Sequence, residues 1–158
     1  MDKEFAGKDI LDLAVSIERN GYEFYTETAK RFDNLKTVKL FHYLAEQELM
    51  HERFFKNLKE SETAAGMQGG EFWAASPFGD TAGTRERIKS VSTVEEAIAA
   101  AIAFEKDTVV LYTILKGQID PKGKGLIEGI IDAELDHIKR LLRLKKEYNT
   151  ELSRGEDY

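Results

Sequence analysis

Apolar residues recur every three or four positions along four segments of the chain, and this spacing predicts four amphipathic helices. The predicted helices span about residues 9–32, 35–59, 93–116 and 121–148. The segment of about residues 60–92 between the second and third helices is rich in glycine and also contains aromatic residues. We expect it to be a connection with some packing of its own, and we expect the polar tail from Asn149 onward to fray.

Residues that commonly cap helices stand at the predicted boundaries. Asp33 or Asn34 can cap the second helix. Ser92 or Thr93 can begin the third helix, where the sequence has the form of a capping box. Pro121 fits the first position of the fourth helix. These residues support the boundaries that the periodicity predicts.

The lengths of the connections predict how the helices are arranged. The first two helices are joined by a few residues, as are the last two, and short loops make antiparallel neighbours. The middle connection has about thirty residues, whereas about a dozen extended residues span a helix of ~25 residues. We therefore expect the connection to cross the bundle and the second and third helices to be parallel. The predicted fold class is all-α, a four-helix bundle in one domain over residues 1–158.

Ionisable residues interrupt the apolar faces of all four predicted helices. These core positions are Glu18, Glu48, His51, Glu105, Glu134 and His137. Burying an unpaired carboxylate costs on the order of several kcal/mol, and four that converge would also repel one another. A central cation reverses this balance because it favours the ionised form. The pattern therefore predicts a metal site inside the bundle.

Two of the helices carry the same motif, Glu-x-x-His, at Glu48–His51 and Glu134–His137. Side chains three positions apart lie on one helix face, so one helix can offer both to one site. Glu18 and Glu105 each add a carboxylate from the other two helices. A single motif of this kind usually marks a solvated face, and a single core glutamate is often salt-bridged. The joint occurrence of matched motifs and matched glutamates favours a centre of two metal ions.

The two halves of the chain also repeat a tyrosine. Tyr25 follows Glu18 by seven positions, and Tyr112 follows Glu105 by seven. This indicates a duplicated helix pair with pseudo-two-fold symmetry. Each hydroxyl can donate a hydrogen bond that orients a ligand carboxylate, or it can belong to an ordinary core tyrosine. The presence of a tyrosine in both halves favours the first interpretation.

Other ionisable residues near the motifs are not predicted to be metal ligands. His42 lies off the apolar face and is predicted to be a surface histidine. Glu46, Glu52 and Asp136 are predicted to be solvated charges, although Asp136 could also contact a residue that binds the metal. In the middle connection, the aromatic residues are expected to pack rather than to bind a cofactor.

Composition narrows the chemistry. The chain has no cysteine, which excludes zinc–thiolate and iron–sulfur centres, so oxygen and nitrogen must bind any metal. The net charge of −6 argues against nucleic acid as the main partner. The N-terminal residues lack a signal-peptide pattern, and no apolar run approaches the ~20 residues of a membrane span. We expect a cytoplasmic protein with no membrane partner.

With these motifs in place, residues 9–148 resemble the ferritin-like superfamily and, within it, the rubrerythrin-type di-iron domain. The residues that carry the resemblance are Glu18, Tyr25, Glu48, His51, Glu105, Tyr112, Glu134 and His137. The resemblance implies a ferritin-like bundle with two non-haem iron ions that react with hydrogen peroxide or dioxygen. Manganese or a mixed pair stays open, because oxygen and imidazole ligands suit both metals. We expect Glu48 and Glu134 to bridge the ions, and Glu18 and Glu105 to bind one ion each.

The chain departs from rubrerythrins at two points. Rubrerythrins carry an additional carboxylate three residues after the glutamate of the third helix, where this chain has Thr108. They also usually carry a rubredoxin domain with four cysteines. Electrons are therefore expected to come from an external donor. We also expect a homodimer.

Three functions follow from this pattern. The first is a rubrerythrin-like oxidoreductase that scavenges peroxide or reacts with dioxygen. The second is iron handling, in which ferroxidase activity is followed by storage or delivery. The third is a non-catalytic helical bundle that metal stabilises. The resemblance favours the first.

Overall fold

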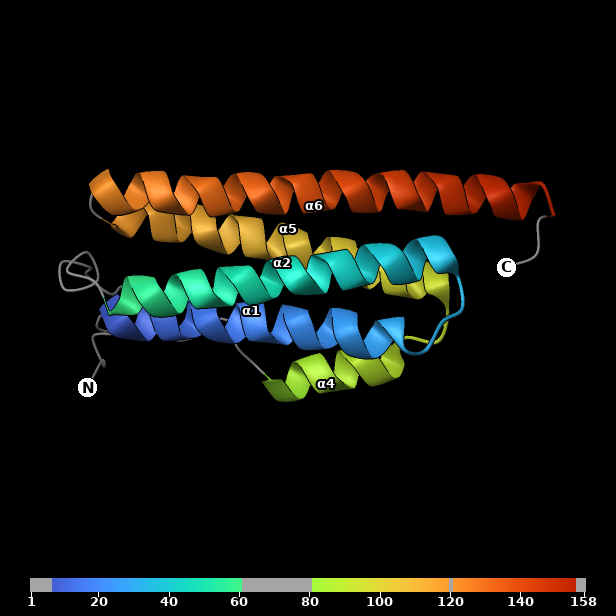
Figure 1. Ribbon diagram of the computed structural model, residues 1–158, viewed down its shortest axis with the longest axis horizontal. Coiled ribbons are helices and arrows are strands. Elements are labelled where there is room, and N and C mark those ends of the chain that lie inside the picture. The colour runs from blue at the N-terminus through green and yellow to red at the C-terminus, as the bar shows by residue number, and fades with distance from the viewer. Residues whose placement is uncertain (1–6, 61–80, 120, 156–158) are drawn as a thin grey trace.

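The computed structural model describes residues 7–60, 81–119 and 121–155, and these residues form helices and connecting loops (Figure 1). The helices are α1 (Gly7–Ala29), α2 (Leu35–Lys59), α4 (Thr81–Ser90), α5 (Val94–Gln118) and α6 (Pro121–Ser153). No strand occurs within the described ranges, which confirms the all-α class. In the part of the chain described, no helix combines the length and apolar character that a membrane span requires.

Four long helices form the bundle, and their directions agree with the predicted topology. α1 is antiparallel to α2, and α5 is antiparallel to α6 (Figure 1). α2 and α5 run in the same direction, as the long connection between them predicts. Most of that connection, including Phe72, Trp73 and Phe78, lies outside the described residues.

The connection ends in a helix that the hydrophobic pattern did not predict. α4 lies along the outside of α1 (Figure 1). Among the side chains of α4 whose burial is described, Ile88 alone is partly buried, and its carbonyl oxygen accepts a hydrogen bond from the Arg31 guanidinium. A single apolar contact on a short polar helix leaves no periodicity for a sequence analysis to detect.

The structure decides between the alternative caps. The Asn34 side chain accepts hydrogen bonds from the Thr37 backbone N–H at 2.9 Å and from its hydroxyl at 2.7 Å. The Thr93 hydroxyl accepts from the Glu96 N–H at 3.1 Å, and the Glu96 carboxylate accepts from the Ser92 N–H at 2.7 Å. Asn34 and Thr93 are therefore the N-caps of α2 and α5.

Two predicted helix ends differ from the structure by three residues or more. α1 ends at Ala29, so Phe32 lies in the loop after it. α6 continues to Ser153, so the prediction that the chain frays from Asn149 is wrong as far as that residue. The tail contains no helix breaker before Gly155, which has a φ of 69° and follows the last turn. Polarity alone does not end a helix.

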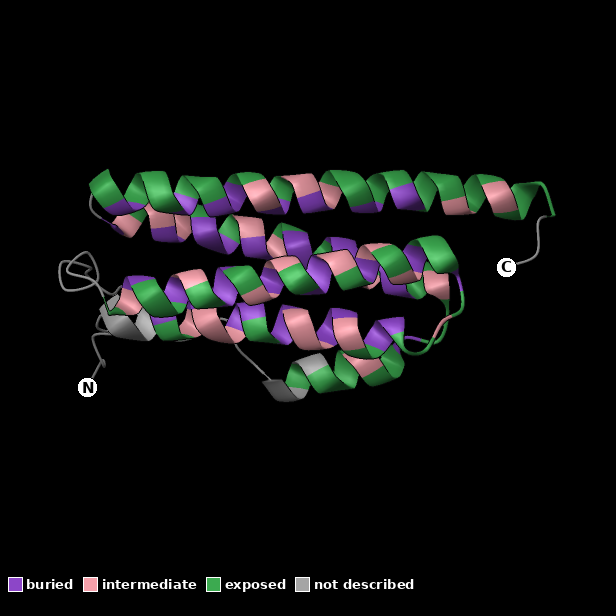
Figure 2. Ribbon diagram, in the orientation of Figure 1, coloured by how far each residue is buried: buried purple, intermediate pink, exposed green. Residues whose placement is uncertain are grey.

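Buried residues line the inner faces of the long helices, and exposed residues face outward (Figure 2). The buried apolar residues form two clusters. The first includes Leu11, Ala14, Phe55, Leu58, Leu111, Leu115 and Ile127, and the second includes Phe24, Phe41, Leu44, Ile98, Ala101, Leu141 and Leu144. In α1, α2 and α6 the predicted ligands lie between the residues of one cluster and those of the other, and in α5 Glu105 lies between Ile102 of the second cluster and Leu111 of the first. The core is thus two apolar layers with a polar layer between them.

Candidate metal centre

The structure brings all six predicted ligands together in this polar layer. Glu18 is on α1, the Glu48–His51 motif on α2, Glu105 on α5 and the Glu134–His137 motif on α6. The four glutamates have no exposed surface, and the exposed fractions of the histidines are 6% and 1%. Each helix places its ligands with the periodicity that also buries its apolar residues.

Glu134 lies between the two histidines. Its Oε1 is 2.9 Å from His51 Nδ1, and its Oε2 is 2.9 Å from His137 Nδ1. The two imidazole rings are stacked with their centroids 5.7 Å apart and an angle of 18° between their planes. One carboxylate thus faces both halves of the site.

The possible ligand atoms form two overlapping groups, in each of which all atoms lie within 4.8 Å of one another. The first group consists of Glu18, Glu48, His51 and Glu134, and the second of Glu48, Glu105, Glu134 and His137. Glu48 and Glu134 belong to both groups. This is the arrangement expected for two cations that share two carboxylates, with one further glutamate and one histidine for each cation.

The cluster is poorly satisfied by the protein alone. Both oxygens of Glu48 and one oxygen each of Glu18 and Glu105 are buried without a hydrogen-bond partner, and the Glu134 oxygens accept no hydrogen bond although each lies 2.9 Å from a histidine nitrogen. A buried polar atom without a partner costs about 1–3 kcal/mol, and more when it is charged. Cations between these oxygens would supply the missing partners, so the residues present fit a metal pair.

The remaining oxygens of the two unshared glutamates are held by tyrosines. The Tyr25 hydroxyl donates to Glu105 Oε1, and the Tyr112 hydroxyl donates to Glu18 Oε1. Both tyrosines are fully buried. The predicted hydrogen bonds to site carboxylates are therefore present, and each one crosses from one half of the chain to the other.

Without a cation, the cluster favours protonated groups. Burial raises the pKa of Glu48 well above its ordinary value, and the nearby charge of Glu134 raises it further. Burial and the charge of Glu134 also raise the pKa of Glu105 to about 8. Burial would lower the pKa of His51 and of His137, but contacts with carboxylates raise both to about 10. Burial would raise the pKa of Glu134, but its contacts with the two histidines lower it to about 2.

Gly21 is a site residue whose role sequence reasoning missed. A Cβ atom at this position would lie 2.6 Å from Glu48 Oε2 and 2.9 Å from Phe104 Cε1. The bare backbone therefore leaves room for the Glu48 carboxylate. A signal existed in the sequence, because glycine inside a helix costs about 0.5–1 kcal/mol relative to alanine and needs a compensating reason.

Glu52, which was predicted to be a solvated charge, is buried, with 4% of its surface exposed. Its carboxylate accepts a hydrogen bond from Lys56 Nζ at 2.6 Å and lies 3.4 Å from an Arg19 nitrogen. The prediction was wrong because the long side chains of Lys56 and Arg19 place their charged groups against the Glu52 carboxylate. Glu52 follows His51 directly, but its contacts are with these two cations.

The other residues set apart from the site lie outside the ligand groups. His42 and Glu46 are exposed, as predicted. Asp136 is partly exposed and accepts a hydrogen bond from Arg140 Nε at 2.6 Å. Thr108, where rubrerythrins have a carboxylate, is buried, and its hydroxyl donates to the Phe104 carbonyl at 3.0 Å.

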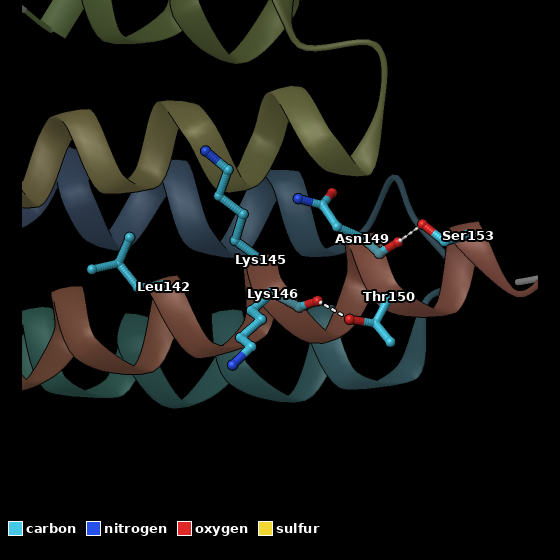
Figure 3. A pocket seen from close by; sticks show the side chains of 6 residues that line it. All are labelled: Leu142, Lys145, Lys146, Asn149, Thr150 and Ser153. Atoms are coloured by element: carbon cyan, nitrogen blue, oxygen red, sulfur yellow. Dashed lines mark hydrogen bonds between the residues drawn. The ribbon is translucent and has the colours of Figure 1, made fainter.

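A hollow on the surface of α6 is unrelated to the polar layer. It is lined by Leu142, Lys145, Lys146, Asn149, Thr150 and Ser153 (Figure 3). The hydroxyls of Thr150 and Ser153 donate to backbone carbonyls of the same helix. A hollow on one helix lacks the converging polar groups of a ligand site.

Two comparisons with known proteins relate the chain to di-iron-carboxylate proteins. The family model described as Rubrerythrin matches residues 9–66. A solved structure, described as a ferritin-like di-iron-carboxylate protein from Thermotoga maritima, is similar with a TM-score of 0.74 and 30% sequence identity. The similarity covers 92% of this chain and 97% of that one. No curated protein matches the chain. The bundle, the two overlapping ligand groups and this similarity show that the chain belongs to the ferritin-like di-iron-carboxylate family, with a rubrerythrin-type domain.

Proposed function

We propose that the protein is an oxidoreductase that uses a pair of iron ions to reduce hydrogen peroxide or to react with dioxygen. The observation that carries the proposal is the sharing of Glu48 and Glu134 by both ligand groups. Two ions that share carboxylates are near enough to act on one small substrate. Peroxide needs two electrons and two protons to become two molecules of water, and a bound iron pair can supply both electrons together.

The ligand set suits two divalent ions. Four ionised glutamates carry four negative charges, which balance two divalent cations. Binding requires ionised glutamates and neutral histidines, so the ions would displace the protons that the cluster favours in their absence. The tyrosines would hold Glu18 and Glu105 by one oxygen each and leave the other oxygen for an ion. Such hydrogen bonds fix the orientation of a ligand.

Anaerobic titration with Fe(II), followed by peroxide or dioxygen in separate samples, tests the proposal. We expect two irons to bind per chain and a ferric absorption band to develop on oxidation. The oxidant that reacts faster identifies the substrate. Binding of fewer than two irons, or no oxidation by either reagent, would contradict the proposal. A parallel titration with Mn(II) compares the two metals.

Thr108 favours a second candidate, iron handling. Its hydroxyl is engaged by the Phe104 carbonyl, and the position contributes no carboxylate to the ligand groups. The site therefore lacks the additional carboxylate that rubrerythrins have at this position. In an iron-handling protein, dioxygen would oxidise many equivalents of Fe(II) with no electron donor other than Fe(II) itself, and the Fe(III) would leave the site. Oxidation that stops at two equivalents per chain would favour the first function.

A further inference from the structure

A partly exposed tyrosine connects the candidate metal centre to the surface. Tyr43 on α2 lies edge-on to His137, with the ring centroids 6.4 Å apart and an angle of 81° between the ring planes. His137 itself is 1% exposed. The Tyr43 ring thus contacts a predicted iron ligand on one side and reaches solvent on the other.

An arginine holds this tyrosine in place. The guanidinium carbon of Arg140 lies 4.9 Å from the centroid of the Tyr43 ring, within the range of a cation–π interaction. Arg140 Nε also donates to the Asp136 carboxylate at 2.6 Å, which fixes the guanidinium. The ring is therefore held against His137 by a charged group that lies at the surface.

The surface beside Tyr43 is locally basic. A hollow between the start of α2 and the second half of α6 is lined by Lys36, Lys39, Arg140 and Arg143, with Glu147 as its acidic residue. Lys36 is paired with Glu147 at 3.7 Å and also with Glu151, and Arg140 is paired with Asp136 at 2.6 Å. Among the described residues, Lys39 and Arg143 form no ion pair with a carboxylate. This basic surface contrasts with the net charge of −6 for the whole chain.

We propose that this docking face, made of Lys36, Lys39, Arg140 and Arg143 and joined to Tyr43 through Arg140, binds an acidic one-electron carrier protein. Electrons from the carrier reach the centre through the Tyr43 ring and His137, because electrons tunnel more readily through packed atoms than across solvent. Two reduced carriers each give up one electron and become oxidised. Those two electrons, with two protons, reduce one peroxide to two waters. The proposal rests on the proposed function.

Binding to the metal-free protein tests the docking face by itself. The probe is an acidic plant-type [2Fe–2S] ferredoxin, titrated by calorimetry at low ionic strength. Reversal of the two unpaired charges, Lys39→Glu with Arg143→Glu, is expected to weaken binding by about tenfold or more. The matched control, Lys122→Glu with Lys124→Glu, makes the same change in net charge at exposed positions in the first turns of α6. Equal weakening by both pairs, or no binding by the wild type, would overturn the docking face.

The rate of electron transfer tests the role of the ring. Stopped-flow reduction of the oxidised, iron-loaded protein by reduced ferredoxin is expected to slow several-fold in Tyr43→Leu and to stay near the wild-type rate in Tyr43→Phe. Tyr22→Leu is the control, because Tyr22 is also partly buried beneath an arginine, with Arg19 5.2 Å from its centroid. Thermal melts confirm that each variant is folded.

The outcomes separate this inference from the proposed function. If the wild type fails to bind two irons, the proposed function fails and this inference fails with it. If iron binds and dithionite reduces it, but ferredoxin reduces Tyr43→Leu as fast as wild type, only the inference about Tyr43 fails.

Discussion

Removing a carboxylate that belongs to both ligand groups should weaken the binding of both ions. Removing a carboxylate that belongs to one group should weaken the binding of one ion. We predict that Glu48→Ala abolishes stoichiometric binding of two irons, because Glu48 belongs to both groups. Glu18→Ala should retain one iron per chain, because Glu18 belongs to the first group alone. Elemental analysis after anaerobic loading and desalting measures both. Two tightly bound irons in Glu48→Ala would disprove the assignment of ligands.

A glycine also has a testable role at the scale of one residue. Gly21→Ala places a methyl group against the Glu48 carboxylate and the Phe104 ring, so we predict weaker metal binding. Gly129→Ala is the matched control, because its Cβ would meet nothing within 4 Å. That change should leave metal binding intact and stabilise the fold by about 0.5–1 kcal/mol. Titration calorimetry and urea unfolding measure the two effects, and normal metal affinity in Gly21→Ala would refute the role.

At the scale of the helix, the contribution of the N-cap of α2 to stability can be compared with that of the residue before it. Asn34→Ala removes the acceptor for two groups of Thr37 and should lower the free energy of unfolding by about 1 kcal/mol. Asp33→Ala changes the adjacent exposed residue, which is not the cap, and should have little effect. Urea denaturation of the metal-free protein measures both. The reverse order of effects would show that Asp33 caps α2 in solution.

The sequence predicts the features of the helices that depend on the spacing of residues. It misses the features that depend on a single contact. The range of α2 and the gathering of the six predicted ligands follow from the spacing of apolar and ionisable residues, and the direction of each long helix follows from the lengths of the connections. α4 was missed because one partly buried side chain, Ile88, makes no periodic pattern. The burial of Glu52 was missed because it depends on Arg19, which lies on another helix. The crowding at Gly21 was missed because it depends on Phe104, more than eighty positions away.

The polar layer makes the stability of the whole molecule depend on pH. We expect metal binding to reverse the direction of this dependence. In the metal-free protein, burial raises the pKa of Glu105 from 4.5 to about 8, and carboxylate contacts raise the pKa of both histidines from 6.5 to about 10. Groups with raised pKa values stabilise the fold below their unfolded pKa, and this stabilisation is lost as pH rises through the folded pKa. The pKa of Glu134, lowered to about 2, contributes stability that is lost only as pH falls below 4.5.

We therefore predict that the metal-free protein is most stable near about pH 5 and loses stability steadily up to about pH 10. With metal bound, stability should instead increase from acidic to neutral pH, because protons compete with the ions for the same ligands. Urea unfolding across this range, with a chelator and then with Mn(II) in excess, compares the two states. A metal-free protein that becomes more stable toward alkaline pH would contradict the ionisation states inferred for the cluster.

The way the two ligand groups draw on the helices has a consequence for assembly. The first group takes its ligands from α1, α2 and α6, and the second from α2, α5 and α6. Neither helical hairpin, α1 with α2 or α5 with α6, contains a complete group. A metal ion can therefore find its full set of ligands only after the hairpins have docked, so metal uptake during refolding should report the final association of the two halves of the chain.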